Sequence, residues 1–210
     1  MIFVLDLDGT LIDSSKRHGA LLKSLLDKRN IKYPQGVESE YLEYKRNGNN
    51  TTHYLTEVLR LEDSESNKIV REWVEHIEDW KWITKDVLYD DTIPFLTKIG
   101  KNNTIIYLSN RQNEVNLIKE LSRLQILQYA NYVYVSNPNN GWKGKSQILS
   151  NILENHTALE ITIIGDSEVD EKAAYDNGIR VFLLNRGFRS KNYWNSRGLS
   201  SICSLNEILL

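Results

Sequence analysis

Short apolar runs without alternation recur along the chain and are the clearest indication of its fold. Continuous runs of this kind are typical of strands buried on both faces, as in a parallel sheet covered by helices. Five segments have this character: 2–5, 104–108, 132–135, 161–164 and 181–184. Three segments with the length and period of helices lie between the last four of these runs: 114–124, 146–153 and 170–177. The alternation of strand and helix predicts an α/β fold with a Rossmann-like, parallel, five-stranded sheet.

The stretch from 14 to 91 breaks this rhythm, because no run within it predicts a convincing strand. Three apolar faces recur there at helical spacing. They are formed by Leu21, Leu22, Leu25 and Leu26, by Tyr54, Leu55, Val58 and Leu59, and by Ile69, Trp73, Ile77 and Trp80. At that spacing we interpret the tryptophans as core residues. We therefore predict an α/β core made of 1–13 and 92–210 and a helical insertion, 14–91, after the first strand.

The composition is that of an ordinary globular protein and limits the classes of partner. The 210 residues are 40% hydrophobic and 26% charged, with a formal net charge of -2, so we predict no nucleic-acid partner. No apolar stretch approaches the roughly 18 residues of a membrane-spanning helix, and the opening run is too short for a signal peptide. We expect a cytoplasmic protein without a membrane partner, and the sequence carries no signal for its oligomeric state. The one cysteine, Cys203, is predicted to be a small core residue.

Polar residues of a distinctive kind follow the predicted strands. They are Asp6 and Asp8 after the first strand, Ser109 and Asn110 after the second, and Asp166 and Asp170 after the fourth. Ligands bind beyond the carboxyl ends of the strands in open α/β sheets, so we expect these side chains to meet in one crevice.

Carboxylates that converge without a partner repel one another and raise their own pKa values. A hard divalent cation resolves that conflict, and ligation by oxygen alone with retained waters suits Mg²⁺. Magnesium implies a phosphate, because such sites hold the ion between carboxylates and phosphoryl oxygens. Ser109, Asn110 and a lysine after the third strand would cradle the remaining phosphoryl oxygens. The candidates for that lysine are Lys145 and Lys143.

In their order and over essentially the whole chain, these motifs resemble those of the haloacid dehalogenase-like superfamily of phosphohydrolases. Motif one reads Asp6-Leu7-Asp8-Gly9-Thr10, motif two is Ser109, motif three is the lysine, and motif four runs from Gly165 to Asp170. The resemblance favours Lys145 over Lys143, because Ile148 and Leu149 follow Lys145 at the spacing of members whose lysine opens a helix directly. The members that the chain resembles are of the phosphoglycolate phosphatase and β-phosphoglucomutase type. The resemblance implies that 14–91 is the helical cap that such members carry.

The resemblance also implies a mechanism. Asp6 would be the nucleophile that forms an aspartyl-phosphate, and Asp8 the general acid and then the general base. Gly9 and Thr10 would shape the phosphate-binding turn. In the family pattern Mg²⁺ is held by Asp6, the backbone carbonyl of Asp8, Asp166 and Asp170, the last directly or through water.

Asp8 separates classes within the superfamily, because the true dehalogenases lack this second acid and need no magnesium. The resemblance therefore favours a Mg²⁺-dependent phosphatase acting on a small phosphomonoester. A sugar phosphomutase is the alternative, and a catalytically silent binding module is a third hypothesis.

Several polar residues of the insertion and of the tail remain to be assigned. By position, the family often has a specificity loop where this chain has Lys45, Arg46 and Asn47. We predict that His18 and His53 are surface or packing residues. We also predict a charged surface loop, without an anion site, for Arg186, Arg189 and Arg197.

Overall fold

The five apolar runs pair into one parallel sheet in the computed structural model of the protein, which describes residues 1–208. The strand order is β5-β4-β1-β6-β7, so the first strand lies at the centre. The strands are β1 (Ile2–Leu5), β4 (Thr104–Ser109), β5 (Tyr132–Val135), β6 (Ile161–Gly165) and β7 (Arg180–Leu183). This arrangement confirms the predicted α/β fold with a five-stranded parallel sheet.

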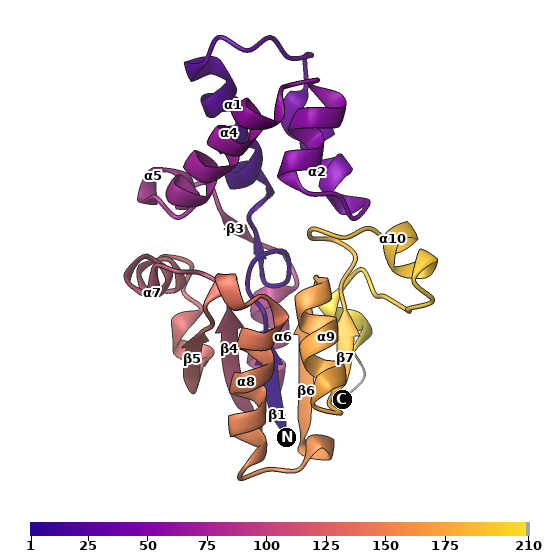
Figure 1. Ribbon diagram of the computed structural model, residues 1–210. Coiled ribbons are helices and arrows are strands. Elements are labelled where there is room, and N and C mark those ends of the chain that lie inside the picture. The colour runs from indigo at the N-terminus through magenta and orange to yellow at the C-terminus, as the bar shows by residue number, and fades with distance from the viewer. Residues whose placement is uncertain (209–210) are drawn as a thin grey trace.

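Both faces of the sheet are covered because the side chains of β1 alternate between two hydrophobic clusters. Phe3 and Leu5 pack in the cluster that includes α6 (Thr92–Ile99) and α7 (Glu114–Arg123). Ile2 and Val4 pack in the other, with helices α8 (Trp142–Leu153) and α9 (Glu168–Asp176). Figure 1 shows α8 and α9 in front of the sheet. The unalternating apolar runs are thus explained by burial on both faces.

A bundle of helices lies beyond the carboxyl ends of the strands, at the top of Figure 1. It has a hydrophobic cluster of its own, which includes Leu22, Tyr41 and Ile69. The elements are α1 (Ser15–Lys28), α2 (Val37–Arg46), α3 (Thr51–His53) with a π-helical turn (Tyr54–Val58), α4 (Asp63–His76) and α5 (Trp80–Ile83). Two short antiparallel strands, β2 (Ile12–Asp13) and β3 (Val87–Leu88), join the connections to the sheet.

Some boundaries differ from the predicted ones. Helix α8 begins at Trp142 and so carries both candidate lysines, and the short strand β3 lies where no strand was expected. The stripe ending in Trp80 is divided between α4 and α5, because the chain is extended at Asp79. Trp80 lies under Lys119, whose Nζ is 3.9 Å from the ring centroid, and belongs to none of the hydrophobic clusters.

The prediction that Cys203 is buried was wrong, because its side chain is exposed and its thiol contacts Glu207. It follows the short helix α10 (Lys191–Ser196) in the terminal segment. Within residues 1–208, no helix combines the length and the apolar character needed to cross a membrane.

We predict that the cluster of the helical bundle contributes strongly to stability. Leu22 is 0% exposed, so Leu22→Ala should lower the free energy of unfolding by about 2–5 kcal/mol. Leu159 is 92% exposed, and Leu159→Ala is the matched control that should leave it nearly unchanged. Urea titration followed by circular dichroism measures both, and equal losses in the two variants would contradict the packing described here.

Candidate active site

Three carboxylates and one ammonium group meet at the carboxyl ends of β1 and β6. Asp6, Asp166 and Asp170 are all buried, and one oxygen of each lies within 4.8 Å of the others. Lys145 Nζ lies between two of them, 2.6 Å from Asp6 Oδ1 and 2.7 Å from Asp170 Oδ1. The structure thus brings together four of the residues that the sequence singled out.

The register of the sheet explains why these residues meet. Leu5 of β1 pairs with Ile164 of β6, so Asp6 and Asp166 leave neighbouring strands at the same edge. Asp170 lies in the first turn of α9, where Oδ2 accepts hydrogen bonds from the backbone N–H and the hydroxyl of Ser167. This capping box turns Oδ1 toward Lys145.

The turn after β1 lies against motif four without room for side chains. Gly9 has φ +81°, and a Cβ there would lie 2.1 Å from Asp166 Oδ2. Gly187 approaches from the loop after β7, where a Cβ would lie 2.0 Å from the same oxygen. The hydroxyl of Thr10 donates a hydrogen bond to Asp6 Oδ2 at 3.1 Å. The glycines permit the close approach, and Thr10 orients the first aspartate.

The three carboxyl groups carry more negative charge than Lys145 beside them can neutralise. Burial raises the pKa of Asp6 to about 7, although Lys145 opposes this effect. Burial and the neighbouring Asp6 carboxylate also hold the pKa of Asp166 well above its usual value. The pKa of Lys145 is raised, because Asp170 and Asp6 outweigh the effect of its burial. Three carboxyl oxygens whose charge Lys145 does not balance form a donor set that fits Mg²⁺, because this ion prefers hard oxygen ligands.

Asp8 lies in a different electrostatic environment, although only Leu7 separates it from Asp6. Its oxygens accept hydrogen bonds from Arg111 Nε at 2.7 Å and Arg111 Nη2 at 2.8 Å, and from Arg17 Nη2. Burial alone would raise the pKa of Asp8, but the two guanidinium groups outweigh it and hold that pKa well below its usual value. The two acids of motif one are therefore held by different cations.

Two further acids lie behind the arginines. Asp86 and Glu120 are 0% exposed, and neither lines the cleft at the ends of the strands. Glu120 contacts Arg111 Nη1, and Asp86 lies 3.2 Å from Arg17 Nε. Burial raises the pKa of Asp86 to about 9, although Arg17 opposes this effect.

The cleft beside these groups has a volume of about 210 Å³. Ser109 and Asn110 line it from the end of β4, and Asn110 Oδ1 accepts a hydrogen bond from Ser136. Trp73 and Ile77 line it from the helical bundle, so part of the stripe interpreted as core faces the cleft. Lys143, the other candidate lysine, is exposed and lies 6.0 Å from the Trp142 ring centroid.

The three side chains of the predicted specificity loop have different surroundings. Lys45 Nζ lies 3.4 Å from His18 Nδ1 and 4.8 Å from the ring centroid of Phe188, both of which line the cleft. Burial lowers the pKa of Lys45 to about 8. Arg46 turns away and donates a hydrogen bond to the backbone oxygen of Asn185, while Asn47 is exposed.

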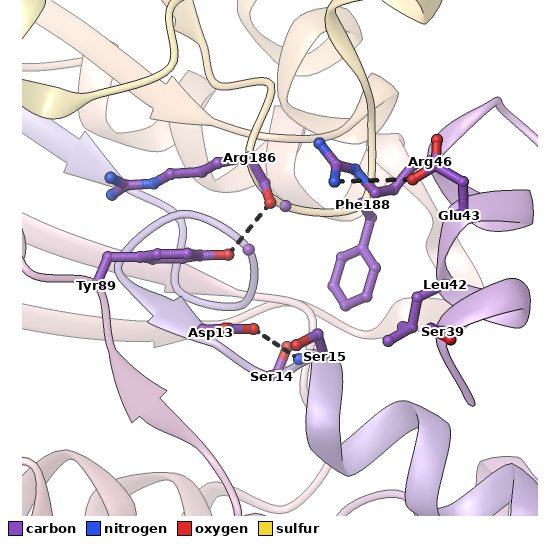
Figure 2. A pocket seen from close by; sticks show the side chains of 12 residues that line it. Asp13, Ser14, Ser15, Ser39, Leu42, Glu43, Arg46, Tyr89, Arg186 and Phe188 are labelled. Atoms are coloured by element: carbon purple, nitrogen blue, oxygen red, sulfur yellow. Dashed lines mark hydrogen bonds and ion pairs between the residues drawn. The ribbon is translucent and has the colours of Figure 1, made fainter. Parts of the chain in front are cut away.

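Arg46 lines a second cavity, of about 300 Å³, between α2 and the loop after β7. Figure 2 shows Arg46 and Glu43 on one side of it and Tyr89, which donates to the backbone oxygen of Arg186, on the other. Phe188 lines both cavities and separates them. Of the three residues of the segment, Lys45 alone reaches residues of the cleft that contains Asp6.

His18 and two of the arginines of the tail make specific contacts near the cleft. His18 is buried in the cleft between Trp73 and Phe188, and burial holds its pKa well below the usual value. It is a packing residue, as one of the two predicted options allowed, but one that faces the site. Arg186 pairs with Asp91, and Arg189 pairs with Glu168 and donates to the backbone oxygen of Lys45. Arg186 and Arg189 thus lie in a charged, partly exposed loop, as predicted, and their charges are paired.

Sequence reasoning missed several residues of the cleft and of its supports. They are Arg17, Asp86, Arg111, Glu120, Gly187 and Phe188. Arg111 directly follows Ser109 and Asn110, and a cation at a strand end was a usable signal. Glu120 lies between Leu117 and Leu121 on the apolar face of α7, where a charge indicates a buried partner.

The fold is similar to several solved structures at low sequence identity. A proposed phosphatase from Clostridium difficile is 20% identical with a TM-score of 0.77, and 100% of this chain and 98% of that chain are covered. A predicted phosphatase from Clostridium acetobutylicum is 18% identical with a TM-score of 0.72, covering 98% and 94%. The proposed HAD-hydrolase YfnB from Bacillus subtilis, bound to magnesium, is 15% identical with a TM-score of 0.60, covering 88% and 88%.

A search of curated proteins found no match to the chain. The family model described as haloacid dehalogenase-like hydrolase matches residues 2–184, which is most of the sequence. The protein therefore belongs to the haloacid dehalogenase-like hydrolase family.

Proposed function

We propose that the protein is a Mg²⁺-dependent phosphatase that hydrolyses a small phosphomonoester through an aspartyl-phosphate on Asp6. The observation that carries the proposal is the contrast between the two acids of motif one. Asp6 lies beside Lys145 among buried carboxylates, whereas Asp8 is held by guanidinium groups. The guanidinium groups favour the ionised form of Asp8, which suits the base that accepts the proton of the attacking water, and Asp6 beside Lys145 suits the nucleophile.

Asp6, Asp166, Asp170 and the backbone carbonyl of Asp8 would hold the magnesium ion. The three side chains suit it because their oxygens lie within 4.8 Å of one another in a buried setting. When bound, the ion supplies positive charge that stabilises the phosphoryl oxygens.

The reaction has two steps in this proposal. An Asp6 oxygen forms a bond to phosphorus while the bond to the leaving oxygen breaks, and Asp8, when it carries a proton taken up from solvent, donates it to that oxygen. A water molecule then attacks the aspartyl-phosphate, Asp8 accepts the proton of the water, and phosphate leaves. Ser109, Asn110 and Lys145 bind the phosphoryl oxygens throughout.

Residues 14–91 would act as a cap that closes over the cleft and excludes water. Trp73 and His18 line the cleft from that side, and Lys45 lies behind His18. We propose that these three side chains face the leaving group and select the substrate. The core would then supply the chemistry and the cap the recognition.

We predict that metal removal abolishes activity. Without a cation, Asp6 and Asp166 repel the phosphate, so EDTA should eliminate the hydrolysis of p-nitrophenyl phosphate and excess Mg²⁺ should restore it. Absorbance of the released nitrophenolate measures the rate. Full activity in EDTA would exclude the proposed chemistry.

We predict that Asp6→Asn lowers kcat by a factor of about 10³ or more, because the amide cannot form the covalent intermediate. With Mg²⁺ and beryllium fluoride, a phosphoryl mimic, the unmodified protein should gain thermal stability and the variant should not. Asp63→Asn is the control, since Asp63 is an exposed carboxylate in the first turn of α4. A variant that retains turnover would show that another group is the nucleophile.

We predict different effects for the two lysines of α8. Lys145→Met removes the cation beside Asp6 and should lower kcat about 10²-fold or more. Lys143→Met removes an exposed charge and should change kcat less than about twofold. Steady-state rates of both variants with p-nitrophenyl phosphate test this, and the reverse order would reassign motif three to Lys143.

A further inference from the structure

Arg111 holds the carboxylate of Asp8 in one orientation. Its Nε donates to Oδ2 at 2.7 Å and its Nη2 to Oδ1 at 2.8 Å, so both oxygens are bound by one planar group. Arg17 Nη2 adds a further hydrogen bond to Oδ1. A guanidinium fork matches a carboxylate in both spacing and direction, which a lysine ammonium cannot do.

The other edge of the Arg111 guanidinium is fixed as well. Its Nη1 donates to Glu120 Oε2, and its Nη2 lies 3.5 Å from Asp86 Oδ2. Arg111 itself is 4% exposed. With acceptors on both edges and no room to swing into solvent, the guanidinium has one orientation.

The two supporting acids have no route to a substrate. Asp86 and Glu120 are 0% exposed and lie outside the residues that line the cleft. Burial of a carboxylate is costly unless the group is paired, and the partners found here are mainly arginines that reach Asp8. Their effect on the reaction must therefore pass through those arginines.

We propose that Arg111 is a positioning residue for Asp8 in the second step, in which the Asp8 carboxylate accepts the proton of the attacking water, and that Glu120 holds Arg111 in place from behind. The inference rests on the proposed function, in which this water hydrolyses the aspartyl-phosphate. The water must be within hydrogen-bond reach of Asp8, and a displacement of about 1 Å can cost about 10²-fold in rate. Arg111 follows β4 in the sheet domain, whereas Arg17 belongs to α1. Arg111 therefore stays beside Asp8 wherever the helical bundle lies.

Arg111→Lys tests the proposal, because it keeps the charge and removes the fork. With Mg²⁺ and p-nitrophenyl phosphate, kcat should fall about tenfold or more while KM changes less than about twofold. Arg123→Lys is the matched control, since Arg123 also neighbours Glu120 but bonds to the backbone oxygens of Ile83 and Asp86. It should leave both constants unchanged.

A double-mutant cycle separates positioning from a general structural effect. If Arg111 acts through Asp8, adding Arg111→Lys to Asp8→Asn should cause no further loss of the residual activity. Glu120→Gln should reproduce the kcat loss of Arg111→Lys in weaker form, again only when Asp8 is present. It also provides the test if Arg111→Lys does not fold, as judged by thermal unfolding.

Several outcomes would overturn the role of Arg111. One is a kcat within about twofold of the unmodified protein in Arg111→Lys, and another is a loss that persists in full beside Asp8→Asn. A large rise in KM would show that Arg111 binds substrate directly, and failure of both Arg111→Lys and Glu120→Gln to fold would assign the cluster to the fold. Inactivity of the unmodified protein would instead contradict the proposed function.

Discussion

Buried negative charge at the carboxyl ends of β1 and β6 is the constraint on which the site depends. Asp6, Asp166 and Asp170 are removed from water, and the ammonium group of Lys145 lies between two of them. The close approach of Gly9 and the capping box of α9 hold the oxygens where they repel one another. Under the proposed function, a divalent cation held by these oxygens would offset their mutual repulsion.

The two acids of motif one differ in environment because different parts of the fold provide their partners. Asp6 leaves β1 beside β6 and meets Lys145 from α8, so the sheet and the helix that covers it set its surroundings. Asp8 lies past the end of the strand, where α1 and the segment after β4 supply Arg17 and Arg111. Asp6 and Asp8 are only two positions apart, yet Asp6 lies among carboxyl groups that a cation would stabilise, whereas Asp8 is already neutralised by two guanidinium groups.

The sequence predicted the sheet and the acids at its edge because both depend on local pattern. Burial on two faces requires continuous apolar runs, and strand ends are visible where such runs stop. The cluster around Asp8 could not be assembled in this way, because Arg17, Asp86 and Glu120 come from separate segments that only the tertiary fold brings together. The preference for Lys145 over Lys143 could not be made certain for a similar reason, since α8 begins before both and only the direction of its faces distinguishes them.

Asp86 and Glu120, the buried acids behind Asp8, would support activity under the proposed function but lower the stability of the fold. Asp86 and Glu120 are 0% exposed, so taking these acids out of water has a cost that their contacts with Arg17 and Arg111 must offset. Well-packed apolar side chains in place of buried ionic groups are often neutral or stabilise a protein by about 1–4 kcal/mol. Selection for heat resistance alone would therefore favour loss of these polar groups, and their presence is a stability cost that the fold tolerates beside Asp8.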